Sequence, residues 1–332
     1  MLTPVFFARA ATSLCAGLLC LNVLAQEKRA IAPGFPSKPI RVMTTVTAGG
    51  GLDFITRAVS AKVGERLLYP IIVDNVAGAN GAIAVNTTMA SAPDGHTLLS
   101  TGGSTPINAV FKKFDKDVRQ ALAPVAQMSS QPYVLYASLA TGFATVQDML
   151  AHARRNPGKL NYGSTGVASV THLGMELIES LAGIDMVHVP YKGSAASMLD
   201  LSSGRLDVLP ASVVAGLQLT RTGKVKALAI TGLQRLPEYP GIPTLSEAGF
   251  PGYELTNTYS LYAAGATPAV ILAALNREVA QALIDPELRK KMAADSSIPA
   301  EPRSPDELRK ILAAEIERWD ALVRKANIKL EE

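Results

Sequence analysis

Two short segments of the chain place glycine and small hydroxyl side chains where a strand is expected to give way to a helix. Residues 47–53 read Thr-Ala-Gly-Gly-Gly-Leu-Asp, and residues 160–173 read Leu-Asn-Tyr-Gly-Ser-Thr-Gly-Val-Ala-Ser-Val-Thr-His-Leu. Such a turn exposes backbone N–H groups at the positive end of a helix, where hydrogen bonds and the helix dipole both favour a carboxylate or a phosphate. The two segments therefore predict two anion-binding loops that meet around one small ligand.

The candidate ligand contacts lie in these two loops and in the turn that follows the next strand. Hydroxyl groups can donate to a carboxylate without charging an empty cleft, and a lysine can attract an anion. The candidates from the residues alone are Gly49, Gly50, Gly51, Asp53, Ser164, Thr165, Gly166, Ser169, His172 and Lys192.

Each candidate also has a structural interpretation. The glycines can simply form a flexible turn, and the hydroxyl groups of the second segment can cap its helix. Asp53 can cap the helix that follows it, and as a carboxylate it would repel an anionic ligand. His172 lies on an apolar stripe and is expected to be packed or hydrogen-bonded. Lys192 can be a solvated charge in a turn that only shapes the chain.

The patterns expected of an enzyme are missing from the sequence. Ser164 lacks the Gly-x-Ser-x-Gly elbow of a nucleophilic serine, and the four histidines show no metal-ligand spacing. Phe54 stands at the third glycine position of a dinucleotide-binding loop, which excludes that site as well. A binding protein without cofactor, metal or catalysis is therefore expected.

The N-terminus resembles a secretory signal peptide. Arg9 provides a positive charge, residues 10–21 are apolar, and residues 23–25 resemble a small-residue cleavage site, so residues 1–25 are predicted to be removed. Both cysteines, Cys15 and Cys20, lie in this segment, so the mature chain is expected to have no thiol and no disulfide. Lipid attachment at Cys20 is a minor alternative. No other segment reaches the roughly 18 apolar residues of a membrane span, and a soluble, exported protein is expected.

Charge gives no indication of a polyanionic partner. The formal net charge is +4, but basic residues are spread among acidic ones, and the longest basic block of the mature chain is residues 289–291. Such a distribution is typical of ordinary solvated faces, so nucleic acid is not expected to be a partner.

From residue 40 onward, short β-branched runs alternate with amphipathic helices, which indicates an α/β fold with mainly parallel strands. Residues 26–36 are expected to form an unstructured leader. Strands are predicted at residues 40–46, 71–73, 97–100, 160–162, 186–189, 208–209, 227–231 and 259–264, and helices at 54–67, 82–90, 146–155 and 169–181.

Two apolar runs within residues 125–136 are expected to carry the chain from one lobe into a second. We predict a first lobe at residues 37–130, a second at 131–254, and a crossover with return to the first lobe at 255–332. Two further helices have start signals: Thr267 with Pro268, and a capping box at Ser304 and Glu307. Ligands of such folds bind in the cleft, at the carboxyl ends of strands.

Five segments in series resemble one known family. They are Gly-Gly-Gly-Leu-Asp at 49–53, Ala-Pro-Asp-Gly-His-Thr-Leu-Leu at 92–99, Asn-Pro-Gly-Lys-Leu-Asn-Tyr at 156–162, His-Val-Pro-Tyr-Lys-Gly-Ser at 188–194, and Ile-Pro-Thr-Leu-Ser-Glu-Ala-Gly at 242–249. Together they resemble the Bug-type extracytoplasmic solute receptors of the tripartite tricarboxylate transporter family, over residues 36–329.

The resemblance implies a type 2, Venus-flytrap periplasmic-binding-protein fold, in which the two loops hold a small carboxylate and no catalysis occurs. It implies a periplasmic location and, as partners, the membrane permease subunits of a tripartite transporter. A receptor that presents its ligand to a membrane sensor is the alternative. The resemblance also adds Ser104, Thr105 and Ser212 to the candidate ligand residues, at positions where relatives often carry other polar groups.

The chain departs from the family pattern at several of these positions. Ala48 stands where a proline is common, and Ala168 where a glycine is frequent. Residues 210–212 read Pro-Ala-Ser where many relatives place an aspartate that meets a ligand amino group. This last difference argues against an amino acid as the ligand.

Overall fold

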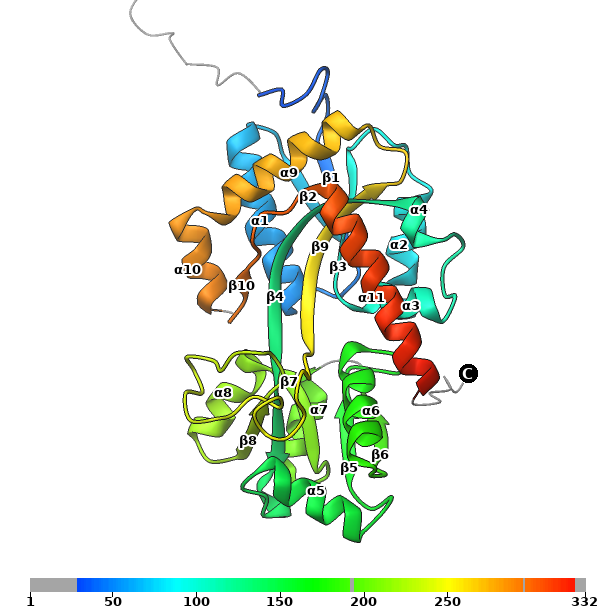
Figure 1. Ribbon diagram of the computed structural model, residues 1–332. Helices are drawn as coiled ribbons and strands as arrows, with labels where there is room; N and C mark the ends of the chain where they lie inside the picture. The colour runs from blue at the N-terminus through cyan, green and yellow to red at the C-terminus, as the bar shows by residue number, and fades with distance from the viewer. Residues whose placement is uncertain (1–28, 192–193, 295, 326–332) are drawn as a thin grey trace, which may run out of the picture.

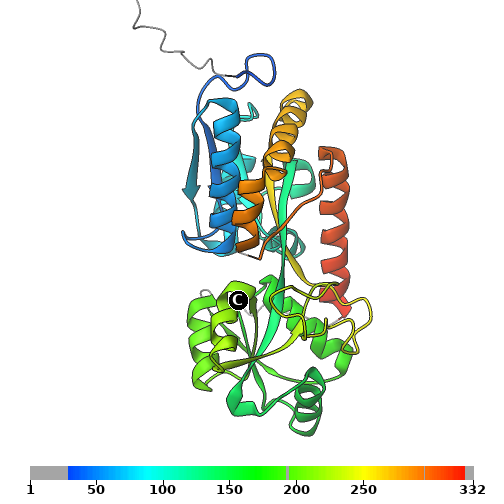
Figure 2. The same ribbon diagram turned by 90° about the vertical axis from the view of Figure 1, so that its left-hand side faces the viewer.

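A computed structural model describes residues 29–191, 194–294 and 296–325 of the 332-residue chain. The predicted signal peptide and Lys192 lie outside the described residues. Figure 1 shows two α/β lobes joined by two long strands, and Figure 2 shows the same arrangement from the side. The predicted two-lobed α/β fold with crossing strands is confirmed.

The first lobe is built on parallel strands β1 (Ile40–Thr44), β2 (Ile71–Asn75) and β3 (Thr97–Thr101), with β1 in the middle. Helices α1 (Gly51–Leu67) and α2 (Ala82–Met89) follow β1 and β2. α1 begins at Gly51, three residues before its predicted start. Asp53 in its first turn accepts the Gly49 N–H (3.0 Å), a carboxylate contact that favours the earlier start.

The second lobe repeats this arrangement around β5 (Asn161–Ser164), which pairs in parallel with β6 (Val187–Pro190) and with β7 (Val208–Ser212). Strand β8 (Val225–Ile230) pairs antiparallel with β4 (Leu122–Ser138). The helices of this lobe are α5 (Val146–Arg155), α6 (Val170–Ala182), α7 (Ser194–Ser203) and α8 (Val213–Arg221).

One strand, β4 (Leu122–Ser138), belongs to both lobes. Its first part pairs with β9 (Thr256–Ala264), and from Tyr133 onward it pairs with β7 and β8. The two strands predicted here are thus a single strand. Its side chains are buried almost without interruption, because the strand lies inside one lobe and then inside the other.

The chain ends with α9 (Ala269–Leu283), α10 (Pro286–Ala294), the short β10 (Ile298–Pro299) and α11 (Pro305–Lys325). The Ser304–Glu307 capping box of α11 is confirmed. The predicted cap by Thr267 is wrong: α9 follows Pro268, and among the described residues the buried Thr267 hydroxyl has no hydrogen-bond partner. Because Pro268 separates Thr267 from the helix, its hydroxyl does not reach the first amides.

Helix α11 packs on both lobes, whereas we expected the C-terminal segment to return to the first lobe only. Leu312 and Ile316 join the apolar cluster around Met43 of β1, and Trp319 joins the main cluster of the second lobe. Figure 1 shows the helix running alongside both lobes. Helix α11 therefore supports the junction between the lobes from outside.

The described part of the predicted leader is structured, so the expectation of an unstructured segment is wrong there. Arg29 N donates to Leu67 O (2.9 Å), and the Phe35 side chain is buried against the His96 ring, with 4.8 Å between ring centroids. Among the described helices, none is both long and apolar enough to cross a membrane.

Candidate functional site

The two glycine- and hydroxyl-rich segments occupy equivalent places in the two lobes. We call residues 45–50 the first loop and residues 164–169 the second loop. The first loop leads from β1 into α1, and the second leads from β5 into α6. A contact through Asn80 links their surroundings, as shown below. The two strand-to-helix turns that the sequence predicts are therefore present, one in each lobe.

The tip of the first loop is formed by two glycines and has no side chain of its own. Gly49 has a φ of +92°, a conformation that favours glycine. Gly50 precedes α1 with extended backbone, and a Cβ placed on either glycine would meet no atom within 4 Å. In the described chain no side chain caps α1, so the first N–H groups of this helix have no side-chain acceptor at the cap.

Asp53 supports the first loop from behind. Its carboxylate accepts hydrogen bonds from Gly49 N (3.0 Å), Arg57 Nε (3.0 Å) and Asn75 Nδ2 (2.8 Å). Burial alone would raise the pKa of Asp53, but these hydrogen bonds and the Arg57 charge outweigh it and lower the pKa. Asn75 Nδ2 also donates to Val46 O (3.0 Å). The observed contacts of Asp53 are those of a supporting residue, and its role as a ligand contact stays a prediction.

Ser164 uses its hydroxyl within the second loop. Its Oγ donates to Gly166 O (3.0 Å) and accepts from Gly166 N (3.1 Å), and it lies 2.7 Å from His188 Nε2. A hydroxyl has one proton and two lone pairs, so these three contacts saturate it. The geometry therefore makes Ser164 a residue that shapes the loop, and ligand contact by its hydroxyl would require breaking one of these bonds.

The remaining hydroxyls of the second loop converge on Thr171. Thr171 Oγ1 accepts from Thr165 N (3.0 Å) and lies 3.2 Å from Thr165 Oγ1 and 3.0 Å from Ser169 Oγ. Ser169 is the N-cap of α6 and accepts from His172 N (3.2 Å). Capping, the structural alternative considered for these hydroxyls, is thus observed. The described hydrogen bonds include none donated by the backbone N–H of Val167 or Val170.

His172 is buried and hydrogen-bonded, as its position on an apolar stripe predicted. Its Nδ1 accepts the N–H of Ala168 (3.2 Å), a residue with a φ of +58°. Its ring stacks on His188 with 3.9 Å between centroids and an interplanar angle of 21°. His188, which the sequence did not single out, therefore lies directly beneath the second loop.

A second group of polar side chains lies where β3 and β9 reach the junction. Thr101 and Thr105 share a hydrogen bond (2.7 Å between hydroxyl oxygens), and both are buried. Gly103 N, next to the candidate Ser104, donates to Asn257 Oδ1 of β9 (3.0 Å). A Cβ on Gly103 would lie 2.8 Å from Val170 Cγ2 of α6. Helix α3 (Ser104–Val110) thus begins against the start of α6.

The Asn80 side chain reaches from the first lobe to the second loop. Its Nδ2 donates to Asn108 Oδ1 (3.1 Å) and to Ala168 O (3.5 Å), and Asn108 Nδ2 donates to Asn80 O (2.8 Å). It lies in the turn η1 (Ala79–Gly81), where Ala79 has a φ of +47° and Asn80 of +50°. A Cβ on Gly81 would come within 2.9 Å of Thr45 in the first loop. The turn therefore touches both loops.

Sequence reasoning identified residues 75–81 only as a glycine-rich turn. A signal was present, since Gly78-Ala79-Asn80-Gly81 combines glycine with asparagine, the residue that best tolerates left-handed backbone after glycine. Of the other candidates, Ser212 caps α8 by accepting from Ala215 N (3.4 Å). Lys192 is not among the described residues.

Carboxylates lie behind the second loop, on α6. Hydrogen bonds from His172 and Tyr162 lower the pKa of Glu176 despite its partial burial, and Tyr162 Oη donates to it over 2.6 Å. Burial and the neighbouring Glu176 charge raise the pKa of Glu179 to about 8. Burial and the neighbouring His172 lower the pKa of His188 to about 4. At neutral pH the groups next to the loop are therefore a neutral His188 and an ionised Glu176.

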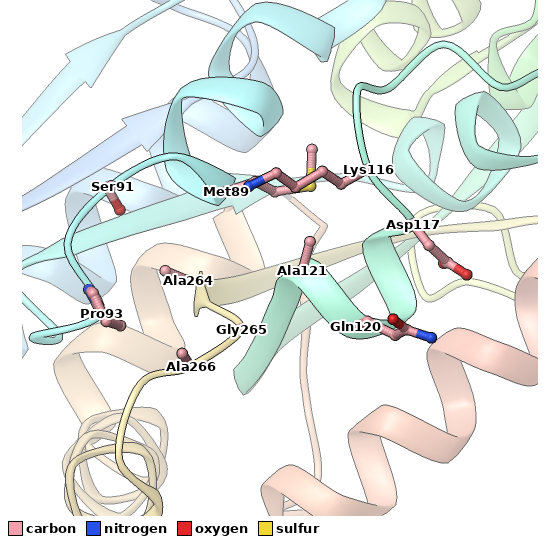
Figure 3. A pocket seen from close by; sticks show the side chains of 10 residues that line it. All are labelled: Met89, Ser91, Pro93, Lys116, Asp117, Gln120, Ala121, Ala264, Gly265 and Ala266. Atoms are coloured by element: carbon pink, nitrogen blue, oxygen red, sulfur yellow. The ribbon is translucent and has the colours of Figure 1, made fainter.

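A cavity of about 420 Å³ lies elsewhere, in the first lobe beside α4 (Val118–Ala121) (Figure 3). Its lining includes Lys116, Asp117 and Gly265, and among its described lining residues none belongs to either loop. In the described part of the chain, no group of three or more His, Cys, Asp or Glu side chains is placed to hold a metal ion.

Comparisons with known proteins identify the family of the chain. A family model described as "Tripartite tricarboxylate transporter family receptor" matches residues 55–328. Protein BugT of Bordetella pertussis is 29% identical over 303 residues, which cover 90% of this chain and 93% of BugT.

Two solved structures are of similar proteins described together with a carboxylate. "R. palustris Rpa4515 with adipate" superposes with a TM-score of 0.80 at 29% identity, covering 89% of this chain and 99% of that one. "MatC (Rpa3494) from Rhodopseudomonas palustris with bound malate" has a TM-score of 0.78 at 29% identity, covering 87% and 100%.

Proposed function

Because the chain belongs to the tripartite tricarboxylate transporter receptor family, a family of Bug-type solute-binding proteins, we propose that it captures a small organic carboxylate between the first and second loops. It delivers this ligand to the membrane permease subunits of a tripartite transporter. The similar proteins described with adipate and with malate support a carboxylate as the ligand class. The signal peptide predicted at residues 1–25 supports a periplasmic location.

The observation that carries the proposal is that the polar side chains in and around each loop are hydrogen-bonded within the protein. Asp53 and Asn75 bind the base of the first loop, and Ser164, Thr171 and His172 bind within the second. The amides at the starts of α1 and α6 remain as the donors for a ligand. Amides at a helix start bind carboxylates without a cationic side chain, because the helix dipole adds to the hydrogen bonds.

A ligand held by both loops also stabilises the closed arrangement of the lobes. An anion that contacts α1 and α6 together binds the closed form more tightly than the open one and shifts the equilibrium towards it. The contact from Asn80 to Ala168 O joins the two lobes, and we assign it to this closed arrangement. The permease would then recognise the closed form.

Presentation of the ligand to a membrane sensor is the second candidate function. It uses the same binding and closure, and only the partner differs. Co-purification with permease subunits, and loss of growth on the bound acid after deletion of the gene, support transport. Unchanged uptake with a lost transcriptional response to the acid supports the sensor.

A thermal-shift screen of the purified mature protein tests the ligand class. We expect dicarboxylates such as adipate and malate to raise the melting temperature, whereas sugars and divalent cations leave it unchanged. Calorimetry then measures the affinity of each hit. A response to sugars or cations without a response to any of a panel of mono-, di- and tricarboxylates would contradict the proposal.

A further inference from the structure

The two ends of the second loop are each bonded to a different histidine of one stacked pair. His188 Nε2 contacts Ser164 Oγ at the start of the loop (2.7 Å), and His172 Nδ1 accepts the N–H of Ala168 near its end (3.2 Å). The two rings stack with centroids 3.9 Å apart, and Tyr162 stacks on the other side of His188 at 5.1 Å. Two rings in contact thus fix both ends of one short loop.

The hydrogen-bond partners define the protons of this pair. Ser164 has one hydroxyl proton; when it donates this proton to Gly166 O, the 2.7 Å contact requires a proton on His188 Nε2, which then donates to Ser164 Oγ. Because His172 Nδ1 accepts from Ala168, the proton of a neutral His172 lies on Nε2, 3.5 Å from Glu176 Oε1.

The charged and titratable groups around the pair agree with this assignment. From α6, Glu176 faces His172, and Glu179 lies one turn further on and accepts the Met186 N–H (2.5 Å). From β5, Tyr162 donates to Glu176 Oε1 (2.6 Å). His188 on β6 has a lowered pKa of about 4 because it is buried beside His172, and it is therefore neutral at pH 7.

The backbone of the loop depends on these contacts. Ala168 has a φ of +58°, which costs a residue with a side chain of the order of 1 kcal/mol or more. Asn80 donates to the carbonyl oxygen of this same residue. Without the acceptor at His172 Nδ1, the Ala168 N–H would be buried and unpaired, and the loop would relax to another conformation.

We propose that His172 and His188 are positioning residues for ligand binding, which hold the second loop in its binding conformation through their ring nitrogens rather than through their bulk. This inference rests on the proposed function, since it names the device that shapes one of the two anion loops. Neither histidine needs to touch the ligand. His172, predicted as a candidate contact, then acts through Ala168.

Variants that separate hydrogen bonding from ring packing test the proposal. In His172→Asn the amide oxygen stands near the position of Nδ1 and accepts the Ala168 N–H, whereas His172→Phe keeps a ring for stacking and has no acceptor. In the same way His188→Gln keeps an N–H donor for Ser164, and His188→Phe does not. His152, on α5 with its ring against Phe143 at 5.4 Å, provides the control pair His152→Asn and His152→Phe.

Calorimetry uses adipate and malate as probes, with circular dichroism as the check of folding. We expect each Phe variant of His172 and His188 to bind about tenfold more weakly, which is the loss of one buried hydrogen bond. The Asn and Gln variants should stay within about threefold of the wild type, and the His152 pair should not change affinity. Tight binding by the Phe variants together with weak binding by the Asn and Gln variants would overturn the proposal, because this result would show that ring packing holds the loop.

Amide hydrogen exchange gives a readout that does not need a ligand. The amides of Gly166 and Ala168 should be protected in the wild type and in the Asn and Gln variants, and should exchange faster in the Phe variants. If the wild-type protein binds neither acid, the proposed function has failed on these probes while the exchange result still decides whether the histidines hold the loop. Equal protection in all variants would overturn their positioning role.

Discussion

The two loops have the same place in their lobes but are held by opposite kinds of chemistry. The first loop is a glycine turn without side chains of its own at its tip. The Asp53 carboxylate holds it from behind and is itself bound by Arg57 and Asn75. The second is held from within by neutral hydroxyls and by two stacked imidazoles. Both arrangements satisfy the side chains and leave backbone N–H groups at the start of a helix.

The difference shows that exposed amides at a helix start, the groups we propose bind the anion, can be obtained in two ways. In the first loop an added side chain meets open space, so substitution there should act on the ligand directly. In the second loop the side chains of Ser164, Ala168 and Ser169 are buried, so substitution there should act through the shape of the loop. The changes below are ordered from the largest expected effect to the smallest.

Gly50→Asp should have the largest effect, because it places a negative charge at the tip of the first loop. We expect carboxylate affinity to fall about a hundredfold or more, from repulsion at close range. Folding should be retained, since aspartate is a favourable N-cap and a Cβ at Gly50 meets no neighbour. Gly50→Asn is the neutral isostere and should weaken binding less. Equal affinities of the two variants in calorimetry would show that no anion lies at this loop.

Asn80→Asp tests the link between the two loops. The change replaces the donor to Asn108 Oδ1 and Ala168 O by an oxygen that repels both. We expect affinity to fall about tenfold, because the closed arrangement loses this contact. Asn86→Asp on α2 is the control, since its Oδ1 acts as an acceptor for Asp115 N and remains one. Wild-type affinity for Asn80→Asp would remove Asn80 from the site.

Ser169→Ala compares the second loop with a helix start outside the site. The change removes the N-cap of α6, and Thr145→Ala removes the N-cap of α5. Each should lower the unfolding free energy by about 1 kcal/mol, measured by urea denaturation. Ser169→Ala should also weaken carboxylate binding by about threefold, because Thr171 loses a partner. A similar loss of affinity in Thr145→Ala would mean that stability alone explains the effect.

Glu179→Gln should have the smallest effect, and it appears as a change in pH dependence. Folded Glu179 keeps its proton to about pH 8, whereas in the unfolded chain it ionises near pH 4.3. Between these values the folded state binds more protons, so the stability of the wild type falls as pH rises. Glutamine lacks this dependence and keeps the acceptor for Met186 N.

Relative to the wild type, Glu179→Gln should therefore gain about 1 kcal/mol in unfolding free energy between pH 5 and pH 8, after allowance for solvent screening. Glu176→Gln is the contrasting variant, because the pKa of Glu176 is lowered and its charge stabilises the folded state at neutral pH. A constant difference between Glu179→Gln and the wild type from pH 5 to pH 8 would show that Glu179 is ionised throughout.

The pattern of strands, helices and turns could be predicted from the sequence because it is locally determined. Hydrophobic periodicity located β1 and α1, and the capping box located α11. Glycine followed by a helix pattern located both loops. Where local signals were weaker, the prediction was less good: helices α3, α7, α8 and α10 were missed, and β4 was divided into two strands.

The hydrogen bonds and ring contacts within the site could not be predicted, because they join segments that are distant in the sequence. His188 lies on a different strand from the loop, and nothing in the sequence shows that it stacks on His172. The saturation of the Ser164 hydroxyl likewise depends on β6. Asn80 was left within a glycine-rich turn because its link to Ala168 joins segments that are 88 residues apart in the sequence.

The central claim is that main-chain amides of both loops hold one carboxylate ligand. A crystal structure of the mature protein with the acid that gives the largest thermal shift tests it most directly. We predict ligand oxygens within hydrogen-bonding distance, directly or through one water, of the N–H of Gly50 or Gly51 on one side and of Val167 or Val170 on the other. A ligand bound to one lobe only, or seated in the cavity beside α4, would contradict it.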